Sequence, residues 1–310
     1  MVRSRIKIVK DVLLNFTRSR WTSSIYNVDE KFAKRKTIIS SQTISDTEHQ
    51  RRYAEAIRKM KRMGMDSFQN WFNKSKDTNQ SIVRGYWDFT FHILTSKVCE
   101  YIKNPEEKTA LEIGYGGGRI LNAACSYFKE VIGIDIHEEQ ETVEAFLRSQ
   151  GKTNFRLIKI SGRTMGVDSR SIDFIYSFIV LQHLSLFDIL VSYIKETYRC
   201  LKPGGIAKLY FARYSNLNLL DQFRYFIQGY KEIPEASINY KSLVVRASKL
   251  KKLCKKVGFR VIEVVGSYKR VPDGYPRIKG GAGWYNFIKR TLEKILDEFP
   301  YLTVDKYEQW

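Results

Sequence analysis

Four glycines lie close together near the middle of the chain, directly after a short apolar run. The segment reads Ala110-Leu-Glu-Ile-Gly-Tyr-Gly-Gly-Gly-Arg119, with glycines at positions 114, 116, 117 and 118. Because glycine lacks a Cβ atom, such a loop can adopt positive φ angles and bring its backbone close to a ligand. A helix that starts after the loop presents free backbone N–H groups in its first turn. The segment therefore predicts a strand, a ligand-binding loop and a helix in succession.

An aspartate ends the next apolar run, Gly133-Ile-Asp135, about twenty residues after the loop. A carboxylate at this place can accept hydrogen bonds from both ribose hydroxyls of a nucleoside cofactor. A dinucleotide-binding loop with the pattern G-x-G-x-x-G needs glycine where Arg119 stands. Glu112 places a carboxylate near the mouth of the loop, which suits the ammonium and sulfonium groups of S-adenosylmethionine better than a pyrophosphate. These residues favour S-adenosylmethionine over NAD as the cofactor.

Four segments of the chain together resemble the class I S-adenosylmethionine-dependent methyltransferases, especially their small-molecule "type 11" branch. The segments are Leu111-Glu-Ile-Gly-Tyr-Gly-Gly-Gly118, Val131-Ile-Gly-Ile-Asp135, Ile172-Asp-Phe-Ile-Tyr-Ser-Phe-Ile-Val-Leu-Gln-His183 and Tyr198-Arg-Cys-Leu-Lys-Pro-Gly-Gly205. They follow in the order and at the spacing of the family. The resemblance covers residues 86–212 and, more loosely, 247–290. It implies methyl transfer from S-adenosyl-L-methionine, which leaves S-adenosyl-L-homocysteine.

The resemblance also implies which residues bind the cofactor. They are Glu112, Gly114, Tyr115, Gly116 and Gly118 at the methionine end, Asp135 at the ribose, Ile136 and His137 beside the adenine, Gly162, Arg163 and Thr164 near the adenine amine, and Phe178 closing over the cofactor. The family usually has aspartate where this chain has Ser161. The usual carboxylate contact to the adenine amine is therefore replaced by backbone or hydroxyl contacts at 161–164.

His183 is the candidate catalytic residue, because it follows the fourth strand near the expected position of the methyl group. An imidazole there can take a proton from a hydroxyl acceptor. The same Gln-His pattern also occurs in the family as a structural element, so a positioning role stays open. The other histidines, His49, His92 and His137, show no metal-ligand spacing, and we expect no metal. The aromatic residues ahead of the domain, Tyr86, Trp87, Phe89 and Phe91, predict either helix packing or a lid.

The net charge of +20 is concentrated in two flanking regions. Residues 1–80 carry +10 and residues 213–290 carry +12, whereas the region between them is close to neutral. Such a field favours anionic partners: phosphorylated or acidic substrates, nucleic acid, or a membrane surface. The lysine-rich segment at 249–256 indicates an amphipathic helix with a solvated basic face and, as a second interpretation, an anion-binding stripe.

The acceptor class is narrowed by motifs that the chain lacks. Base-methylating enzymes of this fold typically carry Asn/Asp-Pro-Pro-Tyr/Phe after the fourth strand, where this chain reads Ser177-Phe-Ile-Val, and the Pro-Cys nucleophile of pyrimidine C5 enzymes is missing as well. We expect a small-molecule, glycan or lipid-linked acceptor, anionic in character and methylated on a hydroxyl. An RNA methyltransferase that uses the positive charge and an inactive S-adenosylmethionine-binding protein are the alternatives.

Short apolar runs that alternate with helical segments from residue 108 onward predict an α/β fold with a parallel sheet and helices on both faces. The resemblance implies a Rossmann-like, seven-stranded, mostly parallel sheet. The predicted strands are 109–113, 131–136, 155–160, 174–178, 206–211 and 259–265, with a last one around 283–288. The predicted organisation is a basic, mainly helical extension at 1–85, a methyltransferase domain at 86–290 with an acceptor-binding insertion at 213–246, and a tail helix at 291–310. A helix is expected from Ser45 to Gly64, and residues 65–85 read as polar and turn-rich.

The sequence also carries signals of location. No apolar stretch approaches the roughly 18 residues of a membrane-spanning helix. The four cysteines lie far apart, which indicates free thiols in a reducing compartment. We expect a cytoplasmic protein, with peripheral contact to the inner face of the membrane as a further interpretation.

Overall fold

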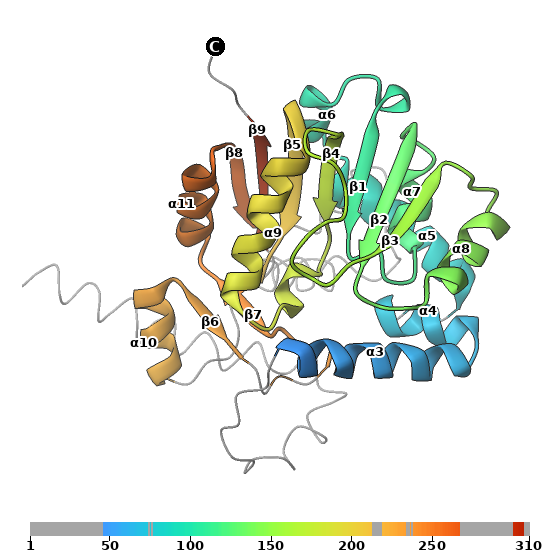
Figure 1. The fold of residues 1–310 in the computed structure, drawn as a ribbon, viewed down its shortest axis with the longest axis horizontal. Helices are drawn as coiled ribbons and strands as arrows, with labels where there is room; N and C mark the ends of the chain where they lie inside the picture. Colours follow the sequence, from blue (N-terminus) through green and yellow to red (C-terminus); the bar gives the residue numbers. More distant parts are fainter. Residues whose placement is uncertain are drawn as a thin grey trace, which may run out of the picture. The chain divides into compact units, whose positions relative to one another are not determined.

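A seven-stranded sheet in the order β3-β2-β1-β4-β5-β9-β8 forms the centre of the chain (Figure 1). The computed structural model describes residues 46–73, 75, 77–212, 219–233, 236, 238–266 and 300–306. They all belong to the unit formed by residues 44–267 and 298–310. The strands of this sheet are β1 (Thr109–Ile113), β2 (Glu130–Asp135), β3 (Phe155–Lys159), β4 (Ile172–Ser177), β5 (Leu201–Tyr210), β8 (Phe259–Gly266) and β9 (Pro300–Lys306).

Parallel pairing joins five of these strands, β1 to β5. Strands β1, β2 and β4 are buried along most of their length, since helices cover both faces, and such strands read as near-continuous apolar runs. Each of the first five predicted runs accordingly falls on one of these strands. The predicted α/β, Rossmann-like arrangement is confirmed, with five strands in the parallel part of the sheet.

Strand β9 corrects the prediction for the C-terminal tail. It pairs antiparallel with both β5 and β8, so residues 300–306 of the expected tail helix are a strand. Its sequence contains Tyr301, Thr303 and Val304, which are residue types that fit a pleated surface, and two neighbouring strands supply its backbone hydrogen bonds. The last strand predicted around 283–288 lies outside the described residues.

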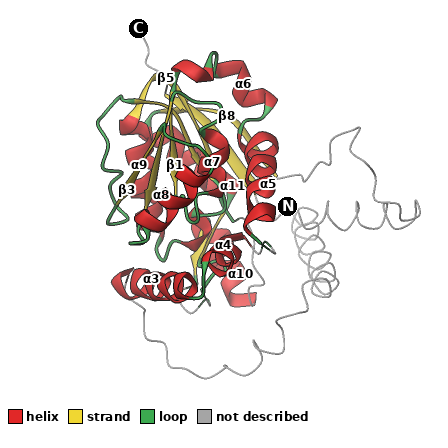
Figure 2. Ribbon diagram, turned by 90° about the vertical axis from the view of Figure 1, so that its right-hand side faces the viewer, coloured by secondary structure: helices red, strands yellow, loops and turns green. Residues whose placement is uncertain are grey.

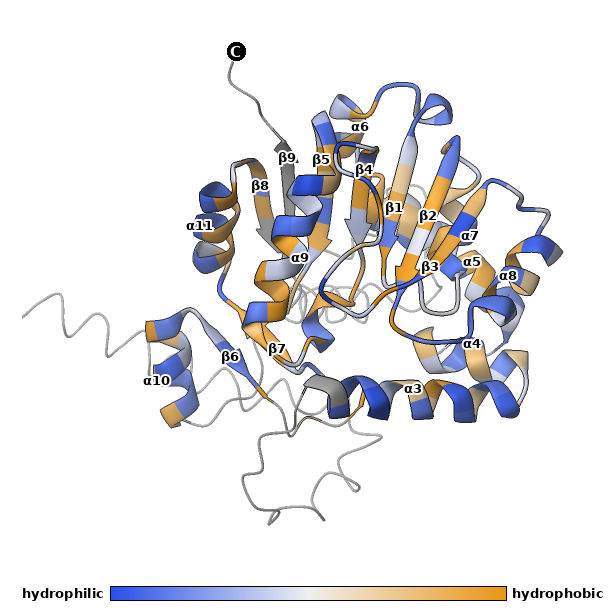
Figure 3. Ribbon diagram, in the orientation of Figure 1, coloured by the Kyte–Doolittle hydropathy of each residue, from blue (hydrophilic) through white to orange (hydrophobic). Residues whose placement is uncertain are grey.

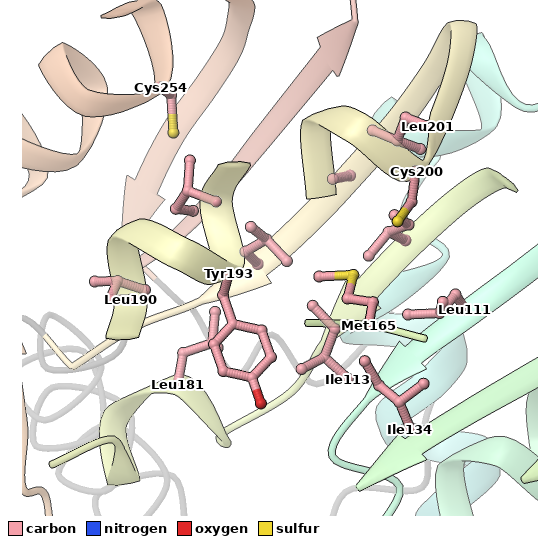
Figure 4. Close-up of a cluster of buried hydrophobic side chains, with 14 of the residues drawn as sticks. Leu111, Ile113, Ile134, Met165, Leu181, Leu190, Tyr193, Cys200, Leu201 and Cys254 are labelled. Atoms are coloured by element: carbon pink, nitrogen blue, oxygen red, sulfur yellow. The ribbon is translucent and has the colours of Figure 1, made fainter. Parts of the chain in front are cut away.

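Helices cover both faces of the sheet (Figure 2). On one face, α7 (Arg119–Ala124) and α8 (Gln140–Ser149) pack on alternate strand residues such as Ala110 and Val131. On the other, α9 (Phe187–Cys200) and α11 (Ala247–Val257) pack on Leu111, Ile113 and their neighbours (Figure 4). Because consecutive strand residues point to opposite faces, each strand contributes to both cores. This packing fixes the carboxyl ends of the strands, where the loops of the candidate site begin.

The segment before the sheet is more helical than the sequence predicts. The helices are α3 (Asp46–Arg62), α4 (Met65–Asn73), α5 (Thr78–Asp88), the π-helix η1 (Phe89–Ile93), α6 (Ser96–Tyr101) and the short η2 (Pro105–Glu107). The helix expected up to Gly64 is confirmed as α3, but α4 and α5 occupy the stretch expected to be turn-rich. Asp77 caps α5 by accepting from the Gln80 N–H, and Asp66 accepts from both the backbone and the hydroxyl of Thr78. Polar residues therefore begin these helices instead of breaking them.

Helix α3 runs across the carboxyl ends of the strands (Figure 1). His49 Nε2 donates to the His183 carbonyl at 2.7 Å, and Gln50 Nε2 donates to the Ser161 carbonyl at 3.3 Å. Arg58 forms an ion pair with Glu138, just after β2. One helix from the N-terminal segment thus contacts the loops that follow β2, β3 and β4, and it forms a roof over that edge of the sheet.

The insertion after β5 contains α10 (Leu219–Gln228) and a two-stranded sheet of β6 (Tyr230–Glu232) and β7 (Leu243–Val245). It reaches the loop after β4 and its short helix η3 (Leu181–His183), because the Ser242 N–H donates to the Gln182 carbonyl at 2.9 Å. Within the part of the chain that is described, no helix combines the length and the apolar character that crossing a bilayer requires.

Candidate functional site

The glycine loop joins β1 to α7 as the sequence predicts. Gly114, Gly116 and Gly118 have φ angles of 77°, 51° and 80°, a region that residues with a side chain rarely adopt. The loop starts parallel to the end of β2, since the Gly114 N–H donates to the Ile134 carbonyl at 2.8 Å. The positive φ angles of the loop therefore require glycine at these three positions.

Close neighbours also restrict the loop. A Cβ atom on Gly114 would lie 2.5 Å from Val180 Cγ1, and one on Gly116 would lie 2.8 Å from Phe72 Cδ1. Val180 belongs to the segment after β4, whereas Phe72 comes from α4. The loop is thus covered on one side by its own domain and on the other by the N-terminal helices.

Asp135 ends β2 and faces this loop. Its Oδ2 accepts from the Gly116 N–H at 2.9 Å, and its Oδ1 accepts from the Ile136 N–H at 2.7 Å. Oδ1 also accepts a longer hydrogen bond from the His137 N–H, at 3.4 Å, whereas Oδ2 keeps one lone pair for a further donor. The side chain is 13% exposed and lines a cavity. A carboxylate held in this way at the wall of a cavity can accept a hydroxyl donor from a ribose, which fits a nucleoside cofactor.

The cavity beside Asp135 has a volume of about 350 Å³, within the range of small-molecule sites. Six residues predicted from the sequence line it: Gly114, Asp135, Ile136, Gly162, Phe178 and His183. The folded chain therefore places these six predicted residues, which come from the ends of β1, β2, β3 and β4 and the loops after them, around one cavity.

Seven other predicted residues do not line the cavity: Glu112, Tyr115, Gly116, Gly118, His137, Arg163 and Thr164. Glu112 is buried under the loop, accepts a hydrogen bond from the Tyr176 hydroxyl at 3.2 Å, and has its pKa raised to about 8 by burial. Arg163 forms an exposed ion pair with Asp188.

His137 fastens the glycine loop. Its Nδ1 accepts from the Glu139 N–H at 3.1 Å, so the proton of the neutral ring is on Nε2, which donates to the Gly116 carbonyl at 3.1 Å. The ring also packs edge-on against Tyr115, at 5.0 Å between centroids, and both side chains are buried. The geometry gives both residues a supporting position behind the loop.

Several cavity-lining residues carry no local signal in the sequence. The roof contributes His49, Tyr53, Trp71 and Phe72 from α3 and α4. None of the aromatics predicted as packing residues or a lid lines the cavity, and Phe89 among them is fully buried. Phe89 therefore packs in the core, and the aromatic residues that cover the cavity come from earlier in the chain.

Arg119 is a second unexpected lining residue. It opens α7, and its Nη1 lies 2.7 Å from Asp88 Oδ2 in an ion pair of which both side chains are nearly buried. Burial lowers the pKa of Arg119, and the Asp88 carboxylate opposes that shift. Arg84 also lines the cavity, so two arginine residues contribute to its wall.

His183 lies at the other end of the cavity in a defined tautomer. Its Nδ1 donates to the Tyr240 carbonyl at 2.8 Å, which leaves Nε2 as an acceptor, 3.2 Å from Gln182 Nε2. Burial lowers the pKa of His183 to about 4, so the imidazole is neutral at physiological pH. The carbonyl oxygen of Gln182, a buried residue that also lines the cavity, has no hydrogen-bond partner among the described residues.

The loop after β4 is strained where it meets the cavity. Ile179 has a φ angle of 61°, which is unusual for a β-branched residue, and its side chain lines the cavity. Such conformations cost about 1–3 kcal/mol and cluster at ligand-binding sites. No cluster of histidine, cysteine or acidic residues suited to a metal ion occurs within the described residues.

Residues 111–209 match the model of a family described as a methyltransferase domain. This match confirms the resemblance to the class I S-adenosylmethionine-dependent methyltransferases. The chain is an S-adenosylmethionine-dependent methyltransferase, with that nucleoside as methyl donor. A comparison with curated proteins finds no match.

Solved structures are similar to this chain. A putative sarcosine dimethylglycine methyltransferase from Galdieria sulphuraria is 15% identical with a TM-score of 0.50, over 75% of this chain and 89% of that one. An S-adenosylmethionine-dependent methyltransferase from Mesorhizobium loti is 13% identical with a TM-score of 0.49, over 68% and 96%. A putative methyltransferase from Bacillus halodurans is 17% identical with a TM-score of 0.48, over 69% and 98%.

Proposed function

We propose that this chain methylates a hydroxyl group of a small acceptor, or of a glycan or lipid-linked acceptor whose reacting end enters the cavity. One observation carries the proposal: a single cavity is lined both by Gly114 and Asp135 and by the residues after β4, and α3 and α4 roof it. A cavity of about 350 Å³ that is open to solvent on one side suits a small reacting group.

The residues along the cavity suggest how the cofactor is held. Asp135 would accept the two ribose hydroxyls, with Ile136 and Gly162 beside the adenine. The Gly114 backbone and the Arg119 guanidinium would meet the methionine end, where Arg119 suits a carboxylate. When bound, S-adenosylmethionine supplies an electrophilic methyl group on its sulfonium. The chain then has mainly to align the acceptor, and alignment alone can lower a barrier by about 7–11 kcal/mol at best.

His183 and Gln182 would orient the acceptor hydroxyl. The neutral His183 ring can accept the hydroxyl proton at Nε2 once the Gln182 N–H gives way, while the Tyr240 carbonyl holds the ring through Nδ1. The unpartnered Gln182 carbonyl oxygen offers an acceptor for a second donor on the substrate. This arrangement favours an acceptor that carries a hydrogen-bond donor next to the methylated oxygen.

An amine acceptor is the second candidate, and the aromatic roof favours it. Tyr53 and Trp71 line the cavity with their rings edge to face, 6.0 Å apart, and aromatic faces attract ammonium groups. The pH profile separates the two acceptors. An amine must lose its proton first, so its rate rises toward alkaline pH, whereas a hydroxyl that donates to His183 gives a rate that is flat above the pKa of about 4.

The cofactor assignment is tested by calorimetric titration of the full chain with S-adenosylhomocysteine, and with NAD in parallel. We expect micromolar binding of the nucleoside alone, loss of binding in Asp135→Ala, and unchanged binding in Asp188→Ala, whose exposed carboxylate pairs with Arg163 outside the cavity. Absence of binding by the unaltered chain at about 1 mM ligand would contradict the residue assignment.

An RNA methyltransferase and an inactive S-adenosylmethionine-binding protein are the two alternatives, and they predict different results in an assay with radiolabelled methyl donor. If the acceptor is RNA held by 6–10 phosphate contacts, its binding affinity should fall about 10³–10⁵-fold between 50 and 200 mM salt. The affinity for a small anionic acceptor should change little over the same range. Turnover with any acceptor would exclude an inactive binding protein.

The free thiols, of which Cys125, Cys200 and Cys254 are buried, support a cytoplasmic location.

A further inference from the structure

Helix α10 exposes an apolar face. Nine large hydrophobic residues are exposed in the described chain, and four of them lie on this ten-residue helix. Their exposed fractions are 77% for Leu220, 67% for Phe223, 58% for Phe226 and 70% for Ile227. Exposed apolar residues that gather on one element mark an interaction surface, whereas scattered ones need no explanation.

The helical repeat explains which side faces outward. Leu220, Phe223 and Ile227 are spaced three and four residues apart, so they share one face of the helix. Tyr225 lies on the opposite side, is buried, and packs with Ala212 and Val244. The helix is therefore anchored to the insertion by one face, while within the described part of the chain its apolar face is exposed (Figure 3).

Basic residues lie on helix α10 and next to its C-terminal end. Arg224 is exposed on the helix itself, and the Arg246 guanidinium lies 5.1 Å from the Phe226 ring centroid. Lys249 contacts Gly229 at the end of the helix. Residues 219–266 contain ten Lys or Arg and four Asp or Glu. The exposed lysines of the adjoining α11 are Lys251, Lys252, Lys255 and Lys256.

A hollow of about 470 Å³ adjoins the apolar face, and Phe223, Arg224, Ile227, Lys231 and Glu232 are among its lining residues. Lys231 pairs with Asp221 of the same helix at 2.8 Å, so Arg224 supplies the exposed positive charge there. Cationic and apolar side chains thus share one small surface. An aromatic and aliphatic helix face bordered by Lys and Arg is the pattern of helices that lie in the interface of an anionic bilayer. We propose that α10 docks this protein onto an anionic membrane surface, with Leu220, Phe223 and Ile227 in the acyl boundary and the basic residues at the headgroups.

The insertion connects this surface to the cavity. Strand β6 follows α10 and pairs with β7, and the segment between them supplies Asn239 to the cavity wall and the Tyr240 carbonyl to His183. Docking through α10 would bring that edge of the cavity toward the bilayer. This last step rests on the proposed function, because it assigns the acceptor to the lipid-linked class.

Co-sedimentation of the full chain with large unilamellar vesicles tests docking without knowledge of the acceptor. The vesicles contain phosphatidylcholine alone, or three parts phosphatidylcholine to one part phosphatidylglycerol. We expect at least about tenfold stronger partitioning onto the anionic vesicles, as basic residues add to the attraction of the apolar face. Equal partitioning onto both kinds of vesicle would overturn the anionic requirement.

The triple variant Leu220→Ser, Phe223→Ser, Ile227→Ser should partition at least about tenfold more weakly onto anionic vesicles. The matched control is Val83→Ser with Phe91→Ser, which removes exposed apolar residues elsewhere and should partition like the unaltered chain. Should the triple variant fail to fold, the single variant Phe223→Asp serves the same comparison. A variant of α10 that partitions as strongly as the unaltered chain would refute docking through this helix.

Titration with S-adenosylhomocysteine separates this inference from the proposed function. The triple variant should bind the nucleoside normally, because none of its changed residues lines the cavity. Sedimentation velocity without vesicles tests whether a second copy of this chain binds the apolar face of α10 instead of a membrane. A dimer that the triple variant abolishes, together with no vesicle binding by the unaltered chain, would assign the face to self-association and overturn the membrane proposal.

Discussion

Gly114→Ala tests how the glycine loop is constrained, because two separate costs can be worked out for it. The φ angle of 77° places an alanine in the left-handed region, which costs about 1–2 kcal/mol. The new Cβ would lie 2.5 Å from Val180 Cγ1, and such overpacking costs about 1–3 kcal/mol. The two together predict a loss of about 2–5 kcal/mol in the free energy of unfolding.

Two further variants separate these costs. Gly151 has a similar φ angle of 71° and no heavy atom within 4 Å of a built Cβ, so Gly151→Ala should show only the backbone cost of about 1–2 kcal/mol. Val180→Ala removes the two closest atoms, Cγ1 and Cγ2, and leaves Cβ at 3.0 Å, so it relieves most of the collision at Gly114 but not the backbone cost. The double variant Gly114→Ala, Val180→Ala should therefore be more stable than the sum of the single effects by about 1–3 kcal/mol.

The assay is urea unfolding followed by linear extrapolation, accompanied by titration with S-adenosylhomocysteine. A common denaturant slope for all variants would show that only native stability changes. Additivity of the two substitutions within about 0.5 kcal/mol would refute the collision as a cause. Recovery of stability without recovery of nucleoside affinity would indicate that Val180 itself is needed at the cavity.

Three other substitutions probe two buried titratable groups and one buried ion pair around the site. Burial raises the pKa of Glu112 from 4.5 to about 8, so its contribution to stability is present below pH 4.5 and is lost as the pH rises through 8. Thermal melts from pH 5 to 9 should therefore show a smaller alkaline loss in Glu112→Gln than in the unaltered chain, and parallel curves would contradict this. The pKa of His183 is lowered from 6.5 to about 4, so its contribution is present above pH 6.5 and is lost as the pH falls through 4, at most about 1.4 kcal/mol per pH unit. His183→Asn should flatten that acid limb, measured by urea unfolding at pH 4 to 7, and an unchanged slope would exclude His183 as its source. Asp88→Ala should lower the free energy of unfolding by about 3–5 kcal/mol, because it leaves the Arg119 guanidinium buried without its carboxylate partner. A decrease below about 1 kcal/mol would show that this ion pair behaves like one exposed to solvent.

Local signals in the sequence were sufficient for the central sheet. Buried parallel strands read as apolar runs, and the glycines mark the turn after the first of them, so the strand at 109–113 and the loop at 114–118 follow from the sequence. The helices at 65–73 and 78–88 did not, since their polar sequence conceals a long-range cause. Phe68 and Gln69 are fully buried because α4 packs beneath α5 and against the glycine loop.

For the site, the sequence predicts positions along the chain better than directions of side chains. Asp135 and His137 are two residues apart after β2, yet the carboxylate lines the cavity whereas the imidazole turns back to the Gly116 carbonyl. That difference depends on the acceptor and donor that the folded loop offers, which no spacing rule contains. The roof residues Tyr53 and Trp71 lie far from the glycine loop in the chain, so only the folded arrangement brings them to the cavity.

The glycine loop itself depends on the N-terminal helices. Gln69 Nε2 donates to the Gly117 carbonyl at 2.7 Å, and the Ser81 hydroxyl holds Gln69 by donating to its Oε1 at 2.9 Å. Phe72 covers Gly116, and it comes from the same helix as Gln69. Residues 111–209, which match the methyltransferase domain, therefore contain the loop and its partners Asp135 and His137, but not Gln69 and Phe72, which hold the loop from the other side. Residues of α3 and α4 also line the cavity. If the acceptor binds there as proposed, the same helices stabilise the glycine loop and contact the acceptor, so a substitution in α4 should alter both nucleoside affinity and acceptor choice.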